Sequence, residues 1–160
     1  MHDPDLTERI VTAASAASAT TAIVVGVPSC NHAGTVASVL RTAQAGLGEF
    51  FSEQSSLLVS ADARSSDGTR EQIRGLRPEN PLLRELGPAD GGAASPGVEV
   101  RELRMILEQA HAVHARACLV LDASVTSMGA DWIERLVRPI LDEQFDIWAR
   151  VIRERNIRAD

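Results

Sequence analysis

The chain has 160 residues, a length that suits one domain with its own hydrophobic core. Its net charge of −6 and its aromatic content of 3% argue against nucleic acid as the main partner. No apolar run reaches the roughly 18 residues that a membrane span needs, and the acidic N-terminus is unlike a secretory signal. The two cysteines, Cys30 and Cys118, are expected to be reduced structural thiols, which indicates a cytoplasmic chain.

Residues 1–20 are rich in Ala, Ser and Thr and have no hydrophobic stripe, so a flexible or helical tail is expected there. The domain is expected over 21–153, with a C-terminal tail at 154–160. Apolar runs bounded by turn residues predict strands at 21–27, 55–63, 116–124 and 145–152. Apolar residues at helical spacing predict helices at 35–47, 65–76, 98–115 and 130–144.

Glycine and proline predict where these elements end. Gly46 and Gly48 are expected to close the first helix, and Pro139 is expected to bend or divide the last one. Residues 77–97 are rich in both residue types and predict a long irregular segment.

The helix at 98–115 carries two patterns. Its apolar face is predicted to consist of Leu103, Ile106, Leu107 and Ala110. His111 and His114 have a spacing that a metal ion could use, but no third ligand is apparent nearby, which favours ordinary surface histidines.

The alternation of strands and helices predicts an α/β fold with a mostly parallel sheet and helices on both faces. In such sheets, ligands bind beyond the carboxyl ends of the strands. Polar motifs follow three of the predicted strands, at 28–31 ("PSCN"), 61–69 ("ADARSSDGT") and 122–124 ("DAS"). The glycine-rich loops of dinucleotide-binding and P-loop proteins are absent from the sequence, so those classes lack support.

Each motif also has a purely structural interpretation. Asn31 can cap the helix that follows it, and Ser66 or Asp67 can cap the helix at 65–76. Asp122 can either cap a turn or bind a metal, and the residues alone leave both open.

Taken together, the three motifs and their strands resemble the nucleotide-sugar-binding half of a family 2 GT-A glycosyltransferase, with glucosyl-3-phosphoglycerate and mannosylglycerate synthases most similar. The resemblance runs over about 21–153 and rests on a Pro-x-x-Asn turn, an Asp-x-x-Ser-x-Asp-Gly-Thr turn and the first Asp of a D-x-D element. It implies a Rossmann-like GT-A fold that is truncated at its C-terminus. It also implies transfer of a sugar from a UDP- or GDP-sugar donor to a small or glycan acceptor.

The resemblance assigns one group of residues to the nucleotide sugar: Pro28, Ser29, Asn31, Asp62, Ser65, Asp67 and Asp122. Asp62 would accept a hydrogen bond from the uracil or guanine edge, whereas Asp67 is expected to be structural in either case. Asp122 and Ser124 would hold Mg²⁺ or Mn²⁺ against the diphosphate, whose negative charge the cation neutralises.

Three departures from the family pattern affect these expectations. Ser124 replaces the second Asp of D-x-D, which predicts weak or lost metal binding. Val98 stands where relatives carry a lysine facing the phosphates, Glu99 lies beside it, and Arg101 is the suggested substitute. The acceptor-binding half that relatives carry beyond the strand at 145–152 has no counterpart in these 160 residues.

These departures support a second hypothesis, a catalytically decayed or truncated GT-A domain that acts as a binding or interaction module. The edge of the predicted strand at 145–152 would then pair with a second copy or with a partner chain.

Overall fold

The computed structural model describes residues 22–62, 65–87 and 98–143, which include a parallel sheet in the order β3-β2-β1-β4. The strands are β1 (Ile23–Ser29), β2 (Ser56–Asp62), β3 (Leu83–Leu86) and β4 (Ala117–Val120). The helices are α2 (Val36–Phe50), α3 (Thr69–Leu76), α4 (Val98–Ala112) and α5 (Asp131–Glu143), with a 3-10 helix, η1, at Arg77–Glu79. The tails predicted at 1–20 and 154–160 and the strand predicted at 145–152 lie outside the described residues.

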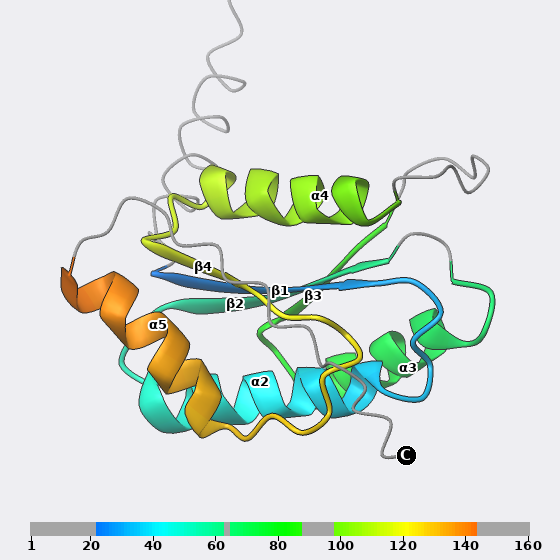
Figure 1. The fold of residues 1–160 in the computed structure, drawn as a ribbon, viewed down its shortest axis with the longest axis horizontal. Helices are drawn as coiled ribbons and strands as arrows, with labels where there is room; N and C mark the ends of the chain where they lie inside the picture. The colour runs from blue at the N-terminus through cyan, green and yellow to red at the C-terminus, as the bar shows by residue number, and fades with distance from the viewer. Residues whose placement is uncertain (1–21, 63–64, 88–97, 144–160) are drawn as a thin grey trace, which may run out of the picture.

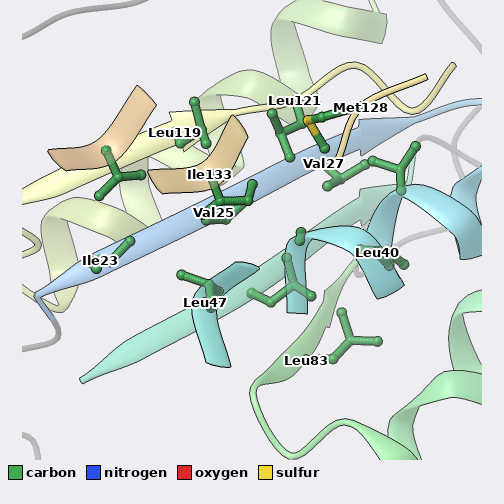
Figure 2. Close-up of a cluster of buried hydrophobic side chains, with 14 of the residues drawn as sticks. Ile23, Val25, Val27, Leu40, Leu47, Leu83, Leu119, Leu121, Met128 and Ile133 are labelled. Atoms are coloured by element: carbon green, nitrogen blue, oxygen red, sulfur yellow. The ribbon is translucent and has the colours of Figure 1, made fainter. Parts of the chain in front are cut away.

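Helices cover both faces of the sheet, which confirms the predicted α/β architecture (Figure 1). Helices α2, α3 and α5 lie on one face and α4 lies on the other. Alternate residues of β1 supply the two cores, since successive strand residues point to opposite faces. Ile23, Val25 and Val27 belong to the core on the side of α2 and α5 (Figure 2), whereas Val24 belongs to the core on the side of α4.

Strand β3 corrects the prediction that 77–97 is irregular throughout. Residues 77–79 form η1, and Leu83–Leu86 pair in parallel with β2. Leu83 is buried in the core on the side of α2 and α5. This tertiary contact outweighs the weak strand preference of a local sequence that is short, charged and flanked by proline.

Helix α2 also differs from its prediction, because it continues through Gly46 and Gly48 to Phe50. A Cβ placed on Gly46 would lie 2.5 Å from Cγ1 of Ile133 and 2.6 Å from the carbonyl oxygen of Ala130. This glycine therefore allows α5 to approach α2 closely instead of ending the helix. Pro139 lies inside α5, and α5 is not divided there.

The two glycines of α2 predict opposite effects of the same substitution. Gly46→Ala is expected to lower the free energy of unfolding by about 1–3 kcal/mol, because the backbone of Ala130 cannot yield to the added methyl group. Gly48→Ala is the matched control. Nothing lies within 4 Å of its added Cβ, so it is expected to stabilise the helix by about 0.5–1 kcal/mol. Urea denaturation followed by circular dichroism measures both, and equal effects would contradict the α2–α5 contact.

Helix α4 presents a different face to the sheet from the one predicted. Ile106 and Ala110 are buried as expected. The third buried residue on this face of α4, four positions before Ile106, is Glu102. Leu103 and Leu107 are 38% and 49% exposed. The helix is rotated in this way because Ile106 packs directly over Gly26 of β1, which has no side chain to hold it off.

The strand order decides where a ligand can bind. The chain passes from β1 to β2 to β3 on one side and then crosses to β4 on the other side of β1. The connections therefore diverge between β1 and β4, and a crevice is expected at their carboxyl ends. None of the described helices is both long enough and apolar enough to cross a membrane.

Candidate functional site

Asp62, the last residue of β2, is fully buried and holds several donors at the carboxyl edge of the sheet. Its Oδ1 accepts hydrogen bonds from the backbone N–H of Ser65 at 2.8 Å and from Nε of Arg70 at 3.3 Å. Its Oδ2 accepts bonds from the hydroxyls of Ser65 at 2.6 Å and Ser29 at 3.2 Å. The register places Ser29 opposite Asp62, so the ends of β1 and β2 are joined through this carboxylate.

Asn31 joins the loop after β1 to the loop after β2. Its backbone N–H donates to Oγ of Ser65 at 2.8 Å, and its Oδ1 accepts from the backbone N–H of Ser66 at 3.0 Å. Its φ of 57° is in the left-handed region, which asparagine tolerates better than most residues. Asn31 does not cap α2, whose N-cap is Thr35.

Asp67 makes the second link between the same loops. Its Oδ2 accepts from the backbone N–H of Ala33 at 3.0 Å, and its Oδ1 accepts from the backbone and hydroxyl of Thr69. The hydroxyl of Thr69 and then the N–H of Ala33 hold the pKa of Asp67 below its ordinary value. These hydrogen bonds to the ionised carboxylate therefore stabilise the folded state at neutral pH. The stabilisation is lost in strong acid, when the carboxylate takes up a proton. The N-cap of α3 is Gly68 at φ 91°, not Ser66 or Asp67 as predicted.

Asp122 follows β4 on the other side of β1. Its Oδ1 accepts hydrogen bonds from the backbone N–H of Ser124 at 2.8 Å and from its hydroxyl at 2.6 Å. The carboxylate therefore does close a turn, as the structural interpretation predicts. It is also partly exposed, so this turn does not exclude a ligand.

The predicted site residues thus form two clusters. One contains the side chains of Ser29, Asn31, Asp62, Ser65 and Asp67, and Pro28 lies beside it in β1. The other contains Asp122 and Ser124. Since neighbouring strands lie about 4.8 Å apart, two strand spacings place the ends of β2 and β4 roughly 10 Å apart.

The second cluster offers limited ligands for a metal. Among residues 22–62, 65–87 and 98–143, no group of three or more His, Cys, Asp or Glu side chains is arranged to hold a metal ion. His111 and His114 have ring centroids 6.4 Å apart and lie at the C-terminal end of α4. Asp122 with Ser124 suits only the kind of Mg²⁺ site in which one carboxylate acts together with substrate phosphates.

Two residues at this edge had no role assigned from sequence. Arg70, in the first turn of α3, points back to Asp62, and its position directly after the Asp-Gly-Thr turn is the signal that could have found it. Glu102 belongs to the buried row of α4, which its spacing from Ile106 and Ala110 could have shown.

Cys30 lies among the acids of this edge. Burial, followed by the charges of Asp62, Glu102 and Asp67, raises the pKa of its thiol. A raised pKa disfavours the thiolate, which is the nucleophilic form of cysteine. Burial raises the pKa of Cys118 to about 11, and both cysteines are free.

The structure places only part of the segment where relatives were expected to carry a lysine. Arg101 is exposed in α4. The side chains of Val98 and Glu99 lie outside the description, so the expected repulsion of a diphosphate by Glu99 stays a prediction.

Comparison with known proteins identifies the fold. No protein-family model matches the sequence, and neither does any curated protein. Among solved structures, glucosyl-3-phosphoglycerate synthase from Mycobacterium tuberculosis with Mn²⁺, UDP and glucosyl-3-phosphoglycerate is similar at a TM-score of 0.55 and 19% identity. The match covers 79% of this chain and 42% of that one.

Two further structures agree. The same synthase with Mg²⁺ and UDP has a TM-score of 0.54 and 18% identity, over 82% of this chain and 43% of that one. S. aureus TarS 1-349 has a TM-score of 0.54 and 18% identity, over 72% of this chain and 31% of that one. The chain therefore spans less than half the length of these proteins, and it matches them in fold.

Proposed function

We propose that this chain, which has the GT-A fold of nucleotide-sugar transferases, binds a nucleoside-diphosphate sugar and takes part in transferring the sugar to a small or glycan acceptor. The observation that carries this proposal is the position of the polar motifs. All three lie at the carboxyl edge of the sheet, on both sides of the point where the strand order diverges. That is the usual ligand site of open α/β sheets.

The two clusters suit the two ends of a nucleoside diphosphate. The base and ribose would lie over the loop at 28–31 and the cluster around Asp62, and the diphosphate would lie beside Asp122. The separation of roughly 10 Å estimated from two strand spacings is comparable to the length of such a ligand.

Asp122 would hold Mg²⁺ or Mn²⁺ together with the oxygens of the diphosphate, since the protein contributes one carboxylate and a hydroxyl there. The bound cation would neutralise the negative charge that develops on the leaving nucleoside diphosphate. Asp122 and Ser124 would orient the diphosphate at the mouth of the crevice. With so few protein ligands, the metal should bind weakly unless nucleotide is present.

Calorimetric titration with UDP and GDP, each with and without Mn²⁺, tests this proposal. We expect Mn²⁺ to tighten nucleotide binding by at least tenfold. Without nucleotide, we expect Mn²⁺ to bind with a Kd of about 1 mM or weaker, which corresponds to a binding free energy of about 4 kcal/mol or less. No heat of binding and no shift in melting temperature with either nucleotide would refute the donor site.

A binding module without turnover is the second candidate. The replacement of the second Asp by Ser124 favours it, as do Val100, Leu103 and Leu107, which expose an apolar stripe on α4. A GDP- or UDP-sugar that binds but is neither hydrolysed nor transferred would support the module. Sugar transfer or hydrolysis by a protein that light scattering shows to be a monomer would refute the module. The free cysteines suit the reducing cytoplasm proposed for either function.

A further inference from the structure

The carboxylate of Asp62 has no remaining capacity to accept a hydrogen bond from a ligand. An ionised carboxylate offers about four lone-pair sites. Four donors fill them in this protein, two on each oxygen, and the side chain is fully buried. A base N–H could therefore bond to Asp62 only if Ser29, Ser65 or Arg70 first moved away.

Arg70 is a cation of this cluster that a ligand can reach. Its side chain is 28% exposed, whereas that of Asp62 is 0% exposed. Its Nη2 lies 2.8 Å from the position that a Cβ on Gly87 would occupy, so the guanidinium packs against the backbone at the end of β3. A guanidinium has five N–H donors. Within the described part of the chain, Nε alone makes a hydrogen bond, to Asp62.

The other arginines that the structure describes near this edge are less well placed. The chain has no lysine, so arginine must make any cationic contact. Arg74 lies one helical turn further along α3, is 57% exposed and pairs with Glu85. Arg101 belongs to α4, on the other face of the sheet. Among the residues that the structure describes, Arg70 is thus the cation that an ion pair holds beside the end of β2.

We propose that Arg70 is the specificity-determining residue for the nucleobase and that Asp62 is the positioning residue that orients it. This inference rests on the proposed donor site. Arginine only donates hydrogen bonds, so it favours a base with an oxygen at the recognised edge. Guanine and uracil carry a carbonyl oxygen where adenine and cytosine carry an amino group, which cannot accept. Arg70 therefore selects keto bases over amino bases.

Titration of four nucleotides with Mn²⁺ present measures this selection. We expect UDP and GDP to bind at least tenfold more tightly than CDP and ADP. In Arg70→Gln, the amide can both donate and accept, so the keto-to-amino ratio is expected to fall close to one. In Arg70→Lys, which keeps a donor but loses the planar fork, part of the ratio should remain.

Asp62→Asn tests the positioning role, because it keeps the shape and removes the charge that holds Arg70. The ratio should fall while binding of all four nucleotides persists. Arg74→Gln, an exposed change in the same helix, is the matched control and should leave the ratio unaltered.

The outcomes separate this inference from the proposed function. If the unmutated protein binds all four nucleotides equally, or if both Arg70 variants keep its keto preference, the role of Arg70 is refuted and the donor site stands. If the unmutated protein binds none of them, the proposed function itself fails. The first comparison needs no variant, so a poorly folded variant cannot leave the inference untested.

Discussion

Gly26→Val is expected to prevent stable folding of the domain. A Cβ on Gly26 would lie 2.3 Å from Cγ2 of Ile106 and 2.9 Å from its Cδ1, and Ile106 is fully buried. Insertion of extra carbons into a packed core costs about 1–3 kcal/mol and occasionally more. Valine adds three carbons at the middle residue of β1, where Ile106 of α4 packs, so a loss of several kcal/mol is expected. Helix α4 covers this face of the sheet (Figure 1). Total stability is commonly only about 5–15 kcal/mol.

A milder variant makes the cause measurable. Gly26→Ala should lower the free energy of unfolding by about 2–3 kcal/mol. Ile106→Ala should lower it by about 2–5 kcal/mol through the cavity that it creates. If the two side chains compete for one space, the double variant should lose clearly less than the sum, as urea denaturation would show. Additive losses would mean that the contact is not the cause.

Asp122→Ala is expected to abolish metal-dependent nucleotide binding. This substitution removes the carboxylate from the second cluster and also the acceptor for both hydrogen bonds from Ser124. Asp122→Asn is the sharper variant, because its Oδ1 can still accept the backbone N–H of Ser124 while the charge is gone. Both variants should bind UDP equally with and without Mn²⁺ in calorimetry. If Asn retains the full Mn²⁺ effect, Asp122 serves only the turn.

Ser124→Asp is the converse change and adds a second carboxylate two residues after Asp122. The added negative charge should raise Mn²⁺ affinity at least severalfold, because Mg²⁺ and Mn²⁺ sites with two carboxylates are stronger than sites with one. The backbone bond from residue 124 to Asp122 does not depend on the hydroxyl, so the turn should survive. A metal titration equal to that of the unmodified chain would count against the idea of a weakened D-x-D element.

Much of the fold could be predicted because its strongest signals are local. The run at 21–27 is apolar and β-branched, and such a run suits a strand buried on both faces whatever surrounds it. The motifs ending at Asn31, Thr69 and Ser124 lie at the ends of three strands, so a parallel sheet brings them to one edge. The resemblance to GT-A glycosyltransferases used this same order, and the solved structures confirm the fold.

The errors share one physical reason, which is that contacts distant in sequence outweighed local preference. Gly46 would end an isolated helix, but α5 packs on it. Leu103 and Leu107 would line an apolar face, but the fit of Ile106 on Gly26 turns Glu102 inward instead. In each case the deciding partner lies in another element.

The sequence by itself determined the α/β class and the strand ends that carry polar residues, because each depends on residue type and local spacing. Only the tertiary structure decided what those residues contact. It buried Asp62 under four donors, directed Arg70 to its carboxylate and let Asp122 close a turn. Hydrogen bonds across 33 positions, such as that from Ser29 to Asp62, depend on strand register, which no local pattern specifies.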